Sequence, residues 1–320
     1  MRRNLSWMRA AALLSACLVY ADVAGAAERI YVLSQTGAKL TEIGDEAGDA
    51  LSSIALDKAP ATLALAPDAP LAYVTHPDLG SVSVVDLAEQ RVLRTIKMPG
   101  SPFGVAVASG GRLYVADWNG DEISVIETAG EKPARTVKAG RAPAHLLLTP
   151  NEKLLFVANR ESNSVSAIRT EDLTIAATIP VGHAPFAIAL SPDAKRLYVG
   201  NVQSGNVSVI DVEQLAVIET RKSGAMPYGA AVTPDGARVL ITNQQSGSVA
   251  VLAGENGTPS SIRVGGYPEG IAIRADGRRA YVANWFSDDV SVLDLDSLKE
   301  IRRIKCPGGP RSVVISHRKP

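Results

Sequence analysis

The chain has 320 residues, more than a typical domain of about 150, yet a closed all-β ring of this size can fold as one unit. Its 33 basic and 33 acidic residues balance, so no overall field draws it to nucleic acid or anionic lipid, and this argues against nucleic acid as a partner. Apolar residues make up 46% of the chain but aromatic residues only 5%, which predicts a core of aliphatic strand residues.

The first 26 residues predict an export signal peptide. Arginines within the first nine residues precede an apolar run over residues 10–20, which is too short to span a membrane, and Ala24-Gly25-Ala26 fits peptidase cleavage. In the alternative interpretation, residues 14–17 (Leu-Ser-Ala-Cys) form a lipobox and Cys17 is lipidated. Either case predicts a periplasmic protein with one domain over residues 27–320, anchored to the outer membrane in the second case.

One block then recurs every 41 or 42 residues. A weak copy, RIYVLSQTGAKLTEIG, starts at residue 29, and clear copies such as RLYVGNVQSGNVSVID start at residues 71, 112, 154, 196, 238 and 279. Each block alternates apolar and polar residues on both sides of a polar turn, which is typical of two short strands joined by a hairpin. A repeat at this period indicates a solenoid or a propeller.

The segments between the blocks supply two more strands. Each contains a moderately polar strand, a loop ending in proline and a strand of small residues, as in TIPVGHAPFAIALSP from residue 178. Seven such four-stranded blades can bury their apolar faces only by stacking around an axis. We number the strands of a blade from the axis outward, so the strand of small residues is the first and the strand that opens each block is the second. Because the chain starts at a second strand near Arg29 and ends at a first strand near Arg311, we predict that the C-terminal strand completes the N-terminal blade.

The blocks also carry a family resemblance, in YVTH at residue 73, FVAN at 156, ITNQ at 241 and YVAN at 281. With these motifs the chain resembles the YVTN-repeat periplasmic seven-bladed β-propellers. That resemblance implies membership of one of several functional groups: noncatalytic binding proteins, companions of quinone-dependent (PQQ) alcohol or amine oxidation, and lactonase-like enzymes. Fold alone does not choose among these groups.

A candidate ligand-binding site follows from the strand order, which places the loops between blades and the turns inside each block on one face of the ring. The residues that follow the loop prolines should ring the entrance of the channel, and Trp118 and Trp285 stand where other repeats carry Gln35, Arg160, Val202 or Gln244. The predicted rim residues are aromatic, basic or acidic: Phe103, Trp118, Arg141, His145, His183, Phe186, Tyr228, Glu269, Trp285 and Arg311. Alternatively, the aromatic residues only plug the channel.

Cofactor chemistry has little support in the sequence. The four histidines fall in different repeats or at the terminus, without the paired spacing of a metal site. A Cys-x-x-Cys-His motif for haem is absent, and residues 117–121 are better explained as a repeat turn than as a calcium loop. Glu269 and Arg311 are expected to form an ion pair rather than a catalytic couple, so we predict no catalytic residue, no metal and no cofactor.

The leading hypothesis is therefore a noncatalytic exported propeller that binds a protein or small ligand on this rim. The resemblance adds a role as accessory of a periplasmic quinone-dependent oxidation system. The first alternative is a lactonase-like or amine-dehydrogenase-like enzyme. The second is binding of single-stranded nucleic acid, with bases stacked on the rim aromatics, although overall neutrality weighs against it.

Overall fold

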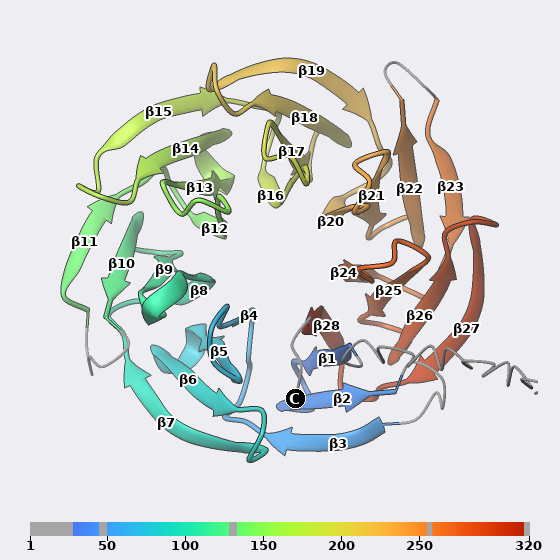
Figure 1. Cartoon of the computed structure of the whole chain (residues 1–320), viewed down its shortest axis with the longest axis horizontal. Coiled ribbons are helices and arrows are strands. Elements are labelled where there is room, and N and C mark those ends of the chain that lie inside the picture. Colours follow the sequence, from blue (N-terminus) through green and yellow to red (C-terminus); the bar gives the residue numbers. More distant parts are fainter. Residues whose placement is uncertain (1–27, 45–49, 128–132, 255–257, 317–320) are drawn as a thin grey trace, which may run out of the picture.

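The structure is a computed structural model that describes residues 28–44, 50–127, 133–254 and 258–316. Within these residues the strands form seven four-stranded antiparallel sheets arranged as blades around a central axis (Figure 1). The only helical segments in this part of the chain are three short 3₁₀ turns, Pro77–Leu79, Ser109–Gly111 and Arg160–Ser162. The predicted all-β seven-bladed propeller is thus confirmed. The predicted leader and Cys17 lie outside the described residues, as does His317.

The strands of each blade are ordered from the axis outward, as the sequence predicts (Figure 1). The first strands, which line the axis, are β4 (Leu63–Leu65), β8 (Pro102–Val107), β12 (Pro143–Leu148), β16 (Pro185–Leu190), β20 (Pro227–Val232), β24 (Pro268–Ile273) and β28 (Pro310–Ser316). The second strands are β1 (Arg29–Ser34), β5 (Leu71–His76), β9 (Leu113–Asp117), β13 (Leu154–Asn159), β17 (Arg196–Asn201), β21 (Arg238–Asn243) and β25 (Arg279–Asn284).

The two outer positions complete each blade. The third strands are β2 (Lys39–Ile43), β6 (Ser81–Asp86), β10 (Glu122–Ile126), β14 (Ser164–Arg169), β18 (Asn206–Asp211), β22 (Ser248–Ala253) and β26 (Asp289–Asp294). The fourth strands are β3 (Ala50–Ala55), β7 (Arg91–Lys97), β11 (Arg135–Lys138), β15 (Ile175–Pro180), β19 (Ala216–Lys222), β23 (Ser260–Arg263) and β27 (Lys299–Lys305).

Burial within a blade explains the sequence pattern. The second strands are buried on both faces because a neighbouring blade covers each face; in β13, residues 155–159 are all buried. The fourth strands alternate between exposed and half-buried residues, as in β19, because they form the outer edge of the ring. Apolar area is therefore buried mainly between blades, by aliphatic side chains of adjacent sheets.

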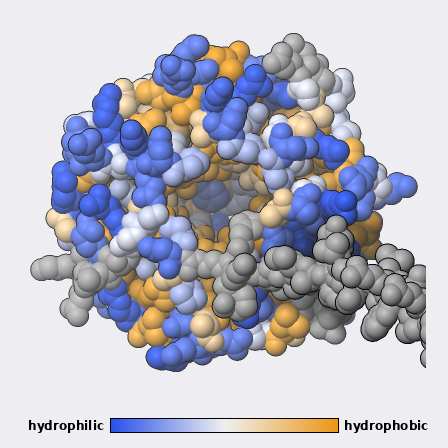
Figure 2. All heavy atoms as spheres, in the orientation of Figure 1, coloured by the Kyte–Doolittle hydropathy of each residue, from blue (hydrophilic) through white to orange (hydrophobic). Residues whose placement is uncertain are grey.

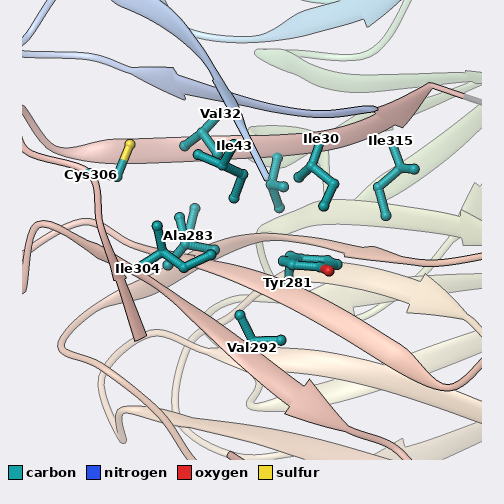
Figure 3. Packing of buried hydrophobic residues seen from close by; sticks show 11 residues of the cluster. Ile30, Val32, Ile43, Tyr281, Ala283, Val292, Ile304, Cys306 and Ile315 are labelled. Carbon is teal, nitrogen blue, oxygen red and sulfur yellow. The ribbon is translucent and has the colours of Figure 1, made fainter. Parts of the chain in front are cut away.

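The ring closes in the first blade, as predicted. Strand β28 pairs antiparallel with β1, with Arg29 opposite Ser316 and Val32 opposite Val313. Side chains of this composite blade then pack on the seventh blade, where Ile30 and Ile315 lie near Tyr281 (Figure 3). Backbone pairing and apolar packing therefore hold the ring closed together.

The polar residue at the end of most second strands ties the loops to the blade. Asn159 is fully buried; its Nδ2 donates to the hydroxyls of Ser164 and Ser166 in β14, and its Oδ1 accepts from Gly140 N at 3.1 Å. A Cβ on Gly140 would lie 2.7 Å from the Asn159 amide carbon, so this close approach requires glycine. Asn159 therefore joins the interblade loop to the third strand.

The face of the ring viewed in Figure 2 carries many hydrophilic side chains and has a depression at its centre. Among the described residues, no helix is long and apolar enough to cross a membrane.

Candidate functional site

The candidate site is a cavity of about 160 Å³ where the first strands meet around the axis. Its walls come from all seven blades: Ala61, Thr62, Leu63, Gly104, Val105, His145, Leu146, Phe186, Tyr228, Gly229, Glu269, Gly270, Arg311 and Ser312. Most residues that follow the loop prolines lie here, because six of the seven first strands begin at that proline, at the same end of the ring. The sequence analysis predicts the ligand-binding site on this face of the ring.

Glycines in several first strands let neighbouring blades approach closely at the cavity. A Cβ on Gly229 would lie 2.1 Å from the carbonyl oxygen of Glu269, and one on Gly104 would lie 1.9 Å from that of Ala144. Such contacts are forbidden, so any other residue would push the blades apart. The Pro-x-Gly pattern thus fixes how deeply the intervening side chain, such as Glu269, is placed at the axis.

Glu269 is the acidic group of the cavity and is only 6% exposed. Gln244 Nε2 donates to its Oε1 at 2.8 Å. Its Oε2 lies 3.3 Å from Arg311 Nε, but no hydrogen bond of adequate geometry reaches this oxygen. Burial raises the pKa of Glu269 above its ordinary value, while Arg311 and the hydrogen bond from Gln244 oppose that rise. One carboxylate oxygen is therefore fixed, and the other is buried with an unused capacity to accept a hydrogen bond.

Thr242 holds the backbone of Glu269. Its hydroxyl donates to the Glu269 carbonyl at 2.7 Å and accepts from Gly229 N at 2.7 Å. Thr242 lies near the end of β21, and Gln244 follows in the turn just after the strand. The end of β21 and this turn thus hold Glu269, a residue of the next blade, at both its main chain and its side chain.

Arg311 and Tyr228 form the polar wall beside Glu269. Arg311 Nη2 donates to Tyr228 Oη at 3.1 Å, and its guanidinium carbon lies 5.5 Å from the centre of the Phe103 ring. Burial raises the pKa of Tyr228 to about 12, with Glu269 adding to the rise against the opposing effect of Arg311. The phenol therefore keeps its proton at neutral pH and can donate it into the cavity.

His145 lies on another wall of the cavity, with its ring 4.5 Å from that of Phe186. Burial, assisted by the positive charge of Arg311, lowers the pKa of His145 to about 4. The imidazole is therefore neutral at pH 7. It contributes a polar but uncharged group to the wall.

The rim aromatics pack on one another beside the cavity. Phe103 contacts Trp118 at a ring distance of 4.9 Å and Phe186 at 5.8 Å, and Phe186 lies 4.1 Å from Tyr228. Phe186 is 2% exposed and belongs to a buried apolar cluster. These contacts agree with the alternative in which the aromatics fill the channel, although Phe186 and Tyr228 still line the cavity.

Five predicted rim residues do not line the cavity: Phe103, Trp118, Arg141, His183 and Trp285. Arg141 and His183 are exposed in their loops, where their backbone N–H groups donate to Ser162 Oγ and Ser204 Oγ. Each precedes an alanine with positive φ, where the chain turns inward and leaves the preceding side chain outside. Trp285 packs instead against Phe286, at 4.8 Å between rings.

Sequence reasoning missed Thr242 and Gln244 as residues of the site. Gln244 stands at the turn position where Trp118 and Trp285 were selected, so a search for all departures at that position would have included it. Thr242 had no distinctive signal. The predicted Glu269–Arg311 ion pair is present, with the geometry given above.

Among residues 28–44, 50–127, 133–254 and 258–316, no group of three His, Cys, Asp or Glu side chains is placed to hold a metal ion. Asp117, the start of the calcium-like segment, accepts from the N–H groups of Asn119 and Gly120 in its own turn and from Ser101 N. The turn interpretation fits this arrangement.

Comparisons with known proteins agree with the fold. The chain is a seven-bladed propeller similar to lactonase-type propellers: the family described as "Lactonase, 7-bladed beta-propeller" matches residues 132–261, less than half of the chain. That range includes His145, Phe186, Tyr228 and Gln244 but stops before Glu269. A search of curated proteins gives no match.

Solved structures show the same architecture at low sequence identity. One is hydrazine synthase of Kuenenia stuttgartiensis, at 22% identity and a TM-score of 0.72 over 79% of this chain and 88% of that one. A functionally unknown protein from Desulfotomaculum acetoxidans matches at 14% identity and a TM-score of 0.79, over 91% of this chain and 99% of that one. A "putative 6-phosphogluconolactonase" from Bacteroides uniformis matches at 19% identity and a TM-score of 0.77, over 90% of this chain and 99% of that one.

Proposed function

We propose that this protein is a lactonase-like hydrolase whose reaction takes place in the axial cavity. The observation that carries the proposal is the state of Glu269: one oxygen is held by Gln244, while the other has an unfilled acceptor site beside Arg311. The match to a lactonase family over residues 132–261 supports the same choice among the functions that propellers perform. The proposal replaces our leading hypothesis of a noncatalytic protein.

The chemistry needs a base, a water molecule and a group that stabilises an oxyanion. Glu269 Oε2 accepts a hydrogen bond from water, and its raised pKa makes it a stronger base than an ordinary carboxylate. As the carboxylate takes a proton, the water oxygen forms a bond to the lactone carbonyl carbon. The negative charge that develops on the carbonyl oxygen is stabilised by the Tyr228 hydroxyl and by Arg311.

The ring then opens. The carbon–oxygen bond of the lactone ring breaks, and the departing alkoxide takes the proton that Glu269 received. One lactone and one water thus give one hydroxy acid, and Glu269 returns to its carboxylate form. Neutral His145 and the aromatic walls contact the ring and exclude other water.

The test is hydrolysis of a panel of neutral, carboxylated and phosphorylated lactones. The rate is measured from the release of protons at constant pH. We expect the wild-type protein to hydrolyse part of the panel and Glu269→Gln to lose about 100-fold or more in rate, the usual contribution of a general base. His183→Ala is the matched control, because His183 lies on the same face but outside the cavity. Absence of hydrolysis by the wild type, or full activity in Glu269→Gln, would refute the proposal.

A second candidate is noncatalytic binding of a protein on the rim. Phe286 is 66% exposed and packs on Trp285 and Tyr267, at 4.8 and 4.7 Å between rings, outside the cavity. An exposed aromatic of this kind is common at protein interfaces. The family resemblance suggests a periplasmic accessory of quinone-dependent oxidation as one form of this candidate. It predicts that the wild-type protein hydrolyses no lactone of the panel and that Phe286→Ala weakens partner binding.

A further inference from the structure

Charges in the cavity cancel. Among the described residues that line it, Arg311 is the one arginine or lysine and Glu269 is the one acid. They are in contact at 3.3 Å. His145 adds no positive charge at pH 7, because its pKa lies at about 4. A ligand in the cavity therefore meets a balanced pair rather than a positive field.

The arginines above the cavity do not add a net positive charge inside it. The guanidinium of Arg160 lies 6.0 Å from the Trp118 ring and pairs with Glu161 at 2.5 Å. Arg141 is exposed and donates to the Glu161 carbonyl. Salt and water screen the exposed Arg141. Arg160 is half-buried and opposes the rise in the pKa of Tyr228, but it is paired with Glu161. Neither guanidinium lines the cavity, so neither replaces a cation in contact with a bound ligand.

The size and walls of the cavity limit the ligand further. A closed apolar cavity of roughly 150 Å³ holds one benzene molecule, and this cavity measures about 160 Å³. Its other walls include Leu63, Val105, Leu146 and Phe186. The space therefore suits one five- or six-membered ring with small substituents.

We propose that the cavity selects small, uncharged lactones and that Glu269 is the residue that excludes anionic ones. This inference rests on the proposed function and names its substrate class. A carboxylate or phosphate bound beside Arg311 would also lie beside the buried carboxylate of Glu269, and desolvation would strengthen their repulsion. A phosphorylated sugar lactone is in addition larger than the space.

The test uses two stable rings that differ in one carboxylate: 2-pyrrolidinone, a neutral γ-lactam, and 5-oxoproline, the same ring with a carboxylate. Ligand-observed NMR titration measures their affinities for the wild-type protein. We expect 2-pyrrolidinone to bind about tenfold tighter or more, as one unfavourable charge contact predicts. In Glu269→Gln, Arg311 loses its partner, so 5-oxoproline should gain about tenfold or more in affinity. His183→Ala is expected to match the wild type.

The inference is overturned if the wild type prefers 5-oxoproline, if the preference is the same in a folded Glu269→Gln protein, or if neither ring binds. The wild-type comparison needs no variant and therefore stands even where Glu269→Gln fails to fold. Because lactams are not hydrolysed under these conditions, the binding result is independent of catalysis. Hydrolysis of anionic lactones would overturn this inference and keep the proposed function; selective lactam binding without lactone hydrolysis would do the reverse.

Discussion

The Thr242→Val substitution tests whether β21 determines the position of Glu269. Valine has nearly the shape of threonine, so the change removes the hydroxyl and little else. Two buried backbone groups then lose their partner, Gly229 N and the Glu269 carbonyl, each now at 2.7 Å from Thr242 Oγ1. A buried polar group without a partner costs about 1–3 kcal/mol, so the free energy of unfolding should fall by about 2–6 kcal/mol.

Thr75→Val is the matched control for that change. Thr75 occupies the equivalent position in the second blade, where its hydroxyl donates to the Phe103 carbonyl at 2.6 Å. That carbonyl also accepts from Thr62 Oγ1 at 2.5 Å, so it keeps a partner in the variant. Only Thr62 N, which donates to Thr75 Oγ1 at 3.2 Å, loses its partner, so the expected loss is about 1–3 kcal/mol, half of that for Thr242→Val. Guanidinium unfolding with a common slope would compare the two proteins. Equal losses, or a loss below about 0.5 kcal/mol for Thr242→Val, would show that the hydroxyl is not a structural clamp.

Two further predictions concern ring closure and pH dependence. A chain that ends at Pro310 lacks most of β28, which pairs with β1, so it should show no cooperative unfolding transition by circular dichroism; a transition like that of the full chain would contradict the closure. Gln244→Leu removes the hydrogen bond that lowers the pKa of Glu269, a pKa that burial already holds above its ordinary value. Hydrolysis needs the carboxylate form, so the acid limb of kcat/KM should move to higher pH; an unchanged or lower limb would exclude Glu269 as the base.

The fold could be predicted because its information is local and repeated. Alternation in blocks such as RLYVGNVQ identifies the second strands, and loop prolines mark where the first strands begin. Closure also followed from the order of strands, since the second strand at Arg29 needs a first strand and the chain ends with one near Arg311. Glu269 and Arg311 could be paired in advance because they occupy the same position in adjacent blades.

Contacts that cross from one blade to another were harder to predict. Gln244 reaches Glu269 only through its side-chain conformation and the offset between two sheets, and neither is encoded in the repeat pattern. Arg141 and His183 have the residue types of a rim site, but the backbone turn that follows them leaves their side chains outside. Trp285 breaks the repeat pattern as Trp118 does, yet it packs with Phe286, whereas Trp118 packs with Phe103 beside the cavity.

The pairing of β28 with β1 also bears on when the protein can fold. The N-terminal blade is synthesised first but receives its innermost strand last, so β1 keeps an unpaired edge until the final residues have been made. Contacts between such distant segments form slowly, because a very long loop must close before they are gained. The growing chain therefore has a long interval in which the ring is incomplete, and this favours recognition by chaperones before the ring exists.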